Sequence, residues 1–344
     1  MNSNGKRYRG NPAVDPVVVE IIKGALKSCG DEMESVIVRT SMSPFIREKG
    51  DHFSGLTDRR ARLLYTTNDR AGPGMIEVIW EKYPPETMKP GDVYWANDPY
   101  LLKGAISHSP DMCFIAPAFW RQKIIGYAIC FGHFWDVGGN RPGSISPSNT
   151  DIYQEGLAVP QVRIVEEGRL NDDLYRLILR NSRFPDMMEG DTRAMMAATR
   201  IGQARLTELY ERYGEALTES CFDEMLARSE AVVRRNLAAI SKPGQYVFAD
   251  YVDDDCVTET PYRIEIRIDI EGDRVTVVDG TGSDDQAKGP INYLLHPDIC
   301  RMMFSRFLLR DDRTVTQNQG AYRAIGEVKL RPGSMLQPTR PAPL

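Results

Sequence analysis

The first strong pattern of apolar positions is helical and covers residues 15–42. Apolar side chains recur there every three or four positions, at Val18, Ile21, Ile22, Leu26, Met33, Val36 and Ile37. Asp15 followed by Pro16 is typical of a helix start, because a carboxylate caps the first turn and proline suits the first helical position. Gly30 marks a candidate break between two helices.

Strand-like patterns follow this helix. An extended segment from residue 43 is expected to lead into a hairpin, in which DRRA separates the apolar stretches SGLT and LLYT. Further strands are expected at residues 92–96, 112–120 and 123–134. Arg121 and Gln122 then form the two-residue turn of a second hairpin.

The second half of the chain changes first to helical and then to alternating patterns. Asn171 is a good cap for a helix over residues 171–183, and residues 191–241 predict two or more long helices interrupted at Gly202 and Gly214. Isoleucine at every second position in RIEIRIDI, a glycine turn and the stretch VTVV predict a hairpin. The ending VKLRPGSMLQPTRPAPL is expected to be extended and to pack against another chain.

These patterns predict an α+β fold: a mixed β-sheet core with hairpins and a long helical segment in the middle of the chain. Residues 1–170 are expected to form a metal-site β-rich domain with an N-terminal helix, and 171–242 a helical segment. Residues 243–344 would form a hairpin region and an extended tail that awaits a C-terminal partner. The loop over 138–160 is long enough to suggest a functional role.

Composition excludes several classes of protein. With 42% apolar and 26% charged residues, the 344-residue chain is globular, and a net charge of −5 without a basic stripe argues against nucleic-acid binding. Apolar stretches fall short of the ~20 residues that a membrane span requires, and the polar start has no signal peptide. A cytoplasmic protein without a membrane or nucleic-acid partner is expected, its six cysteines mostly buried and reduced.

Two of the four histidines fall near one end of the hairpin with its turn at Arg121 and Gln122. His108 and Asp111 lie in HSPD just before one strand, and His133 ends the next. With that turn, the two residue numbers of each facing pair add up to 243. Asp111 would therefore face position 132, and His133 would face position 110. Both imidazoles and the carboxylate then converge, a set that binds zinc, manganese or ferrous iron. The alternative is that His108 caps a loop and His133 is a satisfied core histidine.

Residues around this cluster suggest further roles. Asp136 and Glu155 are candidate catalytic residues, either to orient a ligand histidine or to act as a general base. The same register pairs Cys113 with Cys130 as neighbouring thiols. Segment 137–150 is either a backbone N–H site for an anionic substrate group or a plain surface loop. His296 is expected to be structural.

The chain has no phosphate-binding loop of the GxxxxGK[ST] type and no GxGxxG. If ATP is used, we therefore expect a different chain to bind it.

Several long motifs resemble the hydantoinase B/oxoprolinase family, which includes N-methylhydantoinases and the metal-binding subunit of acetone and acetophenone carboxylases. They are DPVVVEIIKGALKSCGDEM, RTSMSPFIREKGDHFSGLTD, PGDVYWANDPYLLKGAISHSPDM, GHFWDVGGNRPGS, DIYQEGLAVPQVRI and NQGAYRAIGEVKLRPGSMLQPTRPAPL. The resemblance implies a divalent metal held by His108, Asp111 and His133, with Asp51 as a further ligand. It also implies a hydantoinase A-type partner that hydrolyses ATP and activates the substrate.

Two departures from that family affect the expected function. Members commonly carry two adjacent histidines before DVGG, whereas Phe134 and Trp135 follow His133 here, and relatives continue beyond the PTRPAPL ending. Either the chain is truncated there, or the gene is split and a companion chain carries the remainder. An aromatic pair beside the metal suits an apolar ketone. The expectation is therefore the metal-binding subunit of an ATP-dependent multi-subunit ketone carboxylase of the acetone or acetophenone type, completed by a companion chain that carries the C-terminal half. The alternatives are the B component of an ATP-dependent cyclic amide hydrolase, of the N-methylhydantoinase or 5-oxoprolinase type, and a non-catalytic scaffold subunit.

Overall fold

The structure is a computed structural model of the chain. It describes residues 14–68, 74–240, 242–272, 274–279, 282–309, 312 and 314–344. The first 13 residues, on which the expectation of no signal peptide falls, lie outside these ranges. No helix within them is long and apolar enough to cross a membrane.

A seven-stranded antiparallel sheet forms the centre of the fold, in the order β2-β1-β5-β4-β3-β6-β7. Its strands are β1 (His52–Asp58), β2 (Leu63–Thr66), β3 (Val93–Ala96), β4 (Asp111–Trp120), β5 (Lys123–His133), β6 (Val162–Glu166) and β7 (Arg169–Leu170). A second sheet has the order β11-β10-β9-β8. Its strands are β8 (Gly244–Val252), β9 (Tyr262–Glu271), β10 (Arg274–Asp279) and β11 (Val328–Lys329). The α+β fold class is confirmed.

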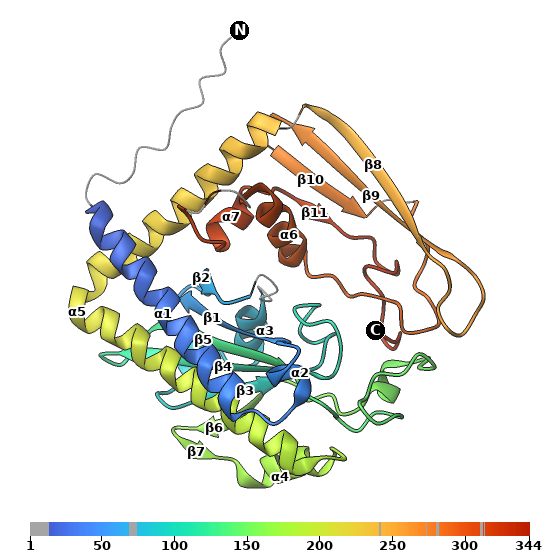
Figure 1. Cartoon of the computed structure of the whole chain (residues 1–344), viewed down its shortest axis with the longest axis horizontal. Coiled ribbons are helices and arrows are strands. Elements are labelled where there is room, and N and C mark those ends of the chain that lie inside the picture. The colour runs from blue at the N-terminus through green and yellow to red at the C-terminus, as the bar shows by residue number, and fades with distance from the viewer. Residues whose placement is uncertain are drawn as a thin grey trace.

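Helices cover both faces of the central sheet (Figure 1). They are α1 (Pro16–Thr40), α2 (Pro44–Arg47), α3 (Met75–Lys82), α4 (Asp172–Arg180), α5 (Pro185–Ile240), α6 (Pro297–Leu309) and α7 (Gln319–Arg323), with short 3-10 helices at Pro85–Thr87 and Ile152–Glu155. Alternate strand residues such as Phe114 pack with α1 and α5 in one core. The intervening ones, such as Ile115, belong to a second core that also holds Ile79 of α3, Met302 of α6 and Val277 of the second sheet.

Helix α1 is continuous, so the break expected at Gly30 is wrong. Its start matches the prediction, because the Asp15 side chain accepts a hydrogen bond from Val17 N at 2.8 Å. Gly30 instead allows a close approach to the sheet, since a Cβ atom there would lie 2.4 Å from Tyr65 Cε1. The segment expected to be extended after α1 contains the short helix α2.

Helix α5 consists of two arms that meet at Gly214, where φ is 73° and ψ is 166° (Figure 1). The predicted interruption at Gly214 is therefore confirmed. The one at Gly202 is wrong, because Gly202 is helical and packs so closely on the sheet that a Cβ atom would lie 2.5 Å from Ala128 Cβ.

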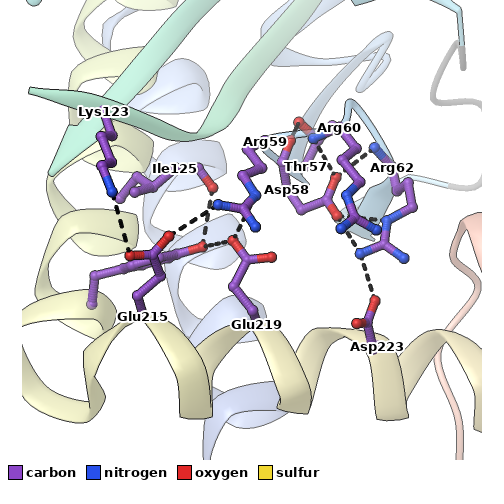
Figure 2. A network of polar contacts seen from close by, with 11 residues as sticks. Thr57, Asp58, Arg59, Arg60, Arg62, Lys123, Ile125, Glu215, Glu219 and Asp223 are labelled. Atoms are coloured by element: carbon purple, nitrogen blue, oxygen red, sulfur yellow. Dashed lines mark hydrogen bonds and ion pairs between the residues drawn. The ribbon is translucent and has the colours of Figure 1, made fainter.

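Ion pairs tie the second arm of α5 to the turn between β1 and β2 (Figure 2). Arg59 Nη1 lies 3.0 Å from Glu215 Oε1, directly after the break. Arg62 Nη2 lies 2.6 Å from Asp58 Oδ2 and 2.7 Å from Asp223 Oδ1. The break in α5 is thus held at a fixed place against the central sheet.

The β4–β5 hairpin has the predicted turn but a different register. Arg121 and Gln122 have φ values of 49° and 64°, as a tight two-residue turn requires. An irregularity beyond Ala118 leaves one extra residue on β5, so the sum of paired numbers changes from 243 to 244. The predicted pairing of Asp111 with position 132 is therefore wrong by one residue: Asp111 faces His133 directly. For the same reason Cys113 faces Phe131, and the predicted pairing with Cys130 is wrong.

The C-terminal region combines a confirmed hairpin, β9–β10, with a strand that sequence reasoning missed, β8. The tail after β11 packs against this chain, where Met335 is buried and its carbonyl accepts a hydrogen bond from Tyr293 N at 2.8 Å. Leu330 and Leu336 are half-buried. A companion chain that covers the tail stays a prediction.

Candidate functional site

His108, Asp111 and His133 form a compact cluster at the end of the β4–β5 hairpin. Asp111 Oδ1 lies 3.3 Å from Nδ1 of both histidines, and potential ligand atoms of the three residues lie within 4.8 Å of one another. Burial alone would raise the pKa of Asp111, but His108, His133 and the Ser107 hydroxyl hold it below its usual value. The convergence expected from the sequence is present, through the shifted register.

The donor set fits a divalent metal. Asp111 and His133 are buried, whereas the side chain of His108 is 31% exposed. Among the described residues, the buried His133 Nε2 has no hydrogen-bond partner, which is unfavourable unless a ligand or ion satisfies it. Phe45 packs edge-on against the His133 ring at 4.5 Å between centroids and fixes its orientation. Two imidazoles and a carboxylate suit zinc, manganese or ferrous iron.

Asp51 lies beside the cluster without belonging to that compact group. His133 N donates to Asp51 O at 3.0 Å, which extends the β1–β5 register by one pair beyond His52 and Gly132. Facing residues share a face of a sheet, so Asp51, His133 and Asp111 form a row across three strands. The Asp51 carboxylate lies 4.0 Å from Lys49 Nζ. Its role as a further ligand stays a prediction.

A cavity of about 250 Å³ lies next to the cluster and includes His108 in its wall. Its lining residues are His108, Pro110, Ser144, Ile145, Ser146, Pro147, Asn149, Glu155, Cys256, Pro290, Ile291 and Leu344. Half of this wall comes from the loop over 138–160 that the sequence singled out. The cavity is mostly apolar with a few polar groups, a composition typical of small-molecule sites.

Glu155 is a buried carboxyl in the cavity wall, with 3% of its surface exposed. Burial raises its pKa from 4.5 to about 7, against the hydrogen bond that its Oε1 accepts from Leu344 N at 2.7 Å. Ser109 Oγ lies 3.5 Å from Oε2. A carboxyl that titrates near neutral pH suits proton transfer.

Asp136, the other predicted catalytic residue, does not line the cavity and anchors the loop. Its carboxylate accepts hydrogen bonds from Gly138 N, Gly143 N and both the backbone and guanidinium of Arg183, at 2.7–3.1 Å. Burial would raise its pKa, but these hydrogen bonds, led by those from Arg183, lower it. Its catalytic role stays a prediction.

Segment 137–150 is suggested by the sequence as a backbone N–H site for an anion. Some of its N–H groups instead donate hydrogen bonds to a side chain of the same loop. Val137 N and Gly139 N donate to Ser144 Oγ at 2.9 and 3.1 Å. These contacts favour the plain-loop interpretation of its first residues.

Three further residues differ from the expectations or were missed. Cys256, expected to be buried, is exposed at the cavity wall with a φ of 62°. Asn149, which no motif marked, is buried in the wall. His296 is half-buried, and its Nδ1 accepts a hydrogen bond from Asp298 N at 3.2 Å, a structural contact.

The two aromatic residues after His133 lie outside the cavity wall. Phe134 is 1% exposed and packs in the core with Phe114. Trp135 is half-buried beside Phe45, with 5.1 Å between ring centroids.

Comparison with known proteins gives relatives along nearly the whole chain. The B component of a putative D-/L-hydantoinase from Pseudomonas sp. (strain NS671) is 31% identical over 351 residues, covering 96% of this chain and 58% of the relative. The beta chain of the caprolactamase of Pseudomonas jessenii is 27% identical, covering 96% of this chain and 56% of the relative. This chain thus spans little more than half the length of these two relatives.

Solved structures share the fold. The crystal structure of the ATP-dependent caprolactamase from Pseudomonas jessenii has a TM-score of 0.82 and 26% identity, covering 96% of this chain and 57% of that chain. The nucleotide-free structure of acetone carboxylase has a TM-score of 0.80 and 19% identity, covering 96% of this chain and 45% of that chain, and supports the fold alone.

The sequence model of the family described as Hydantoinase B/oxoprolinase matches residues 15–344. Because that match includes every described element from α1 to the end of the tail, this chain belongs to the hydantoinase B/oxoprolinase family.

Proposed function

We propose that this chain is the metal-binding part of an ATP-dependent enzyme that opens a cyclic amide. The observation that carries the proposal is the His–Asp–His cluster beside a small cavity with a carboxyl of pKa about 7. The relatives named hydantoinase, caprolactamase and 5-oxoprolinase support the substrate class.

His108, Asp111 and His133 would hold the metal, which when bound would supply a Lewis acid that polarises a carbonyl oxygen. Asp111 sits between the two imidazoles and orients both, while the Ser107 hydroxyl donates to its other oxygen at 2.9 Å. Asp111 and His133 are buried and face each other on neighbouring strands, which holds both in place.

Glu155 would act as the general base. It lines the same cavity as His108, and burial places its pKa where the carboxylate can both accept and return a proton at neutral pH. Pro110, Ile145 and Pro290 give this cavity a mainly apolar wall. Asp136 would hold the loop that carries Glu155 in place.

Ketone carboxylation, the function expected from the sequence, is the second candidate, and the structure of acetone carboxylase shares the fold. The argument for it from the sequence relied on an aromatic wall of Phe134 and Trp135, and neither residue lines the cavity.

ATP binding is assigned to a hydantoinase A-type partner, because this chain lacks a phosphate-binding loop and the caprolactamase neighbour is named ATP-dependent.

The test is ATP hydrolysis by the complex assembled from this chain and its co-purifying partners. Hydantoin, 5-oxoproline and caprolactam should stimulate phosphate release without bicarbonate, and Asp111→Asn should abolish the response. A response to acetone or acetophenone alone, dependent on bicarbonate, would refute the proposal and favour the second candidate.

A further inference from the structure

Asn149 has an unusual environment within the cavity wall. Its side chain is 1% exposed, and among the described residues its Oδ1 has no hydrogen-bond partner. Asn149 N donates to Ser146 O at 3.3 Å, so a backbone turn fixes the residue in the loop. Burying an unpaired carboxamide oxygen is unfavourable, and next to a cavity it points to a ligand group that pairs with it.

The other polar side chains that the loop contributes to the wall, Ser144, Ser146 and Glu155, already have partners within the protein. Ser144 Oγ accepts the two backbone hydrogen bonds described above, and Ser146 Oγ lies 3.0 Å from Ser148 Oγ. Glu155 accepts from Leu344 N and Ser109. Asn149 is therefore the loop side chain best placed to bind a polar group of a substrate.

The chemistry of a carboxamide selects a particular partner. The ring of a lactam, a hydantoin or an oxoproline forces its amide to be cis, so N–H and C=O lie on the same edge. The primary amide of asparagine presents the same two groups, and the pair forms two antiparallel hydrogen bonds. Only one orientation of the carboxamide makes this pair, with Oδ1 facing the N–H and Nδ2 facing the carbonyl oxygen. A ketone or a lactone has no N–H and leaves Oδ1 unpaired.

We propose that Asn149 is the specificity-determining residue of this site and selects substrates that carry an N–H next to the carbonyl. This inference rests on the proposed function, because it explains how the cavity would distinguish a cyclic amide from a ketone or a lactone. It places the amide edge of the substrate against the loop wall, in the cavity that His108 and Glu155 also line.

The experiment compares two small rings that differ in one group. The purified full chain is titrated with 2-pyrrolidone and with γ-butyrolactone, where a ring oxygen replaces N–H, and binding is followed by ligand-observed NMR. The wild-type chain should bind the lactam roughly tenfold more tightly. Asn149→Ala should remove that preference, whereas Asn140→Ala, at an exposed asparagine of the same loop, should keep it.

Each chain serves as its own reference, because the measured quantity is the ratio of two affinities. Asn149→Asp provides a variant of nearly unchanged volume. It retains an acceptor for N–H and loses the donor to the carbonyl, so it should weaken both ligands while keeping the preference for the lactam. Equal affinities in the wild type, absence of lactam binding, or an unchanged preference in Asn149→Ala would each overturn the proposal.

The outcomes separate this inference from the proposed function. A lactam preference that depends on Asn149, in a chain whose assembled complex hydrolyses no cyclic amide, would refute the function and leave the recognition role standing. Hydrolysis of cyclic amides that is unaffected by Asn149→Ala would support the proposed function and refute the role of Asn149 in recognition.

Discussion

Replacing Glu155 by glutamine should stabilise the protein at alkaline pH while removing activity. In the folded chain the pKa of Glu155 is raised from 4.5 to about 7, a difference that corresponds to roughly 3 kcal/mol. Between these values the folded state keeps a proton that the unfolded state has lost, so the contribution of Glu155 to the free energy of unfolding falls as pH rises through this window. Above pH 7 the ionised carboxylate is buried at its full cost.

Glutamine keeps the shape and the acceptor for Leu344 N without this charge. Urea unfolding should therefore show Glu155→Gln more stable than wild type by up to about 3 kcal/mol at pH 8, and by less than about 1 kcal/mol at pH 4.5. Glu48→Gln, at an exposed carboxyl, is the control and should change stability little at either pH. A Glu155→Gln variant that is less stable at pH 8, or equally changed at both pH values, would refute this account of the carboxyl.

The same variant tests the base. In the assembled enzyme, kcat/KM of the wild type should rise with pH through about 7, because the base must lose its proton. Glu155→Gln should lower the rate by about 10²- to 10⁴-fold and abolish that rise. A variant that gains stability and retains its rate would show that Glu155 is buried for another reason.

Two further predictions concern the metal ligands and the break in α5. His108→Ala and His133→Ala should lose bound metal in elemental analysis while circular dichroism stays unchanged, and His296→Asn should keep the metal; full occupancy in both alanine variants would exclude these ligands. Gly214→Ala should cost about 1–3 kcal/mol in urea unfolding, because a side chain is strained at that φ and ψ. Gly24→Ala, in open space on α1, should be neutral or stabilising by up to about 1 kcal/mol, and equal effects at the two glycines would contradict the assignment of the break.

The sequence predicted those parts of the fold that local patterns determine. The α1 cap, the tip of the β4–β5 hairpin and the helix after Asn171 follow from short-range chemistry, and the structure confirms each of them. Gly202 and Gly214 look alike in the sequence, yet one is helical for close packing and the other breaks α5. Tertiary contacts decide between these roles, and the sequence does not display them.

The errors at the site have the same origin. The extra residue in β5 reflects the twist and packing of the whole sheet, so a count from the turn missed it by one position. Asn149 is a polar residue in a polar loop, and its burial arises where distant segments meet. Strand β8 is exposed along most of its length and lacks the contrast between buried and exposed sides that marks a strand.

The extra residue in β5 divides the hairpin into two regions. An insertion or deletion in the region that leads to Asp111 and His133 disrupts their pairing, whereas one in the turn does not. Without it, Asp111 would face position 132, and His133 would point to the opposite side of the sheet, toward α1 and α5. A single insertion or deletion between this irregularity and His133 would therefore turn His133 away from Asp111. At the tip, some ten residues away, a longer turn leaves the pairing intact, so residues 121–122 are the place to attach a probe or a label without disturbing the site.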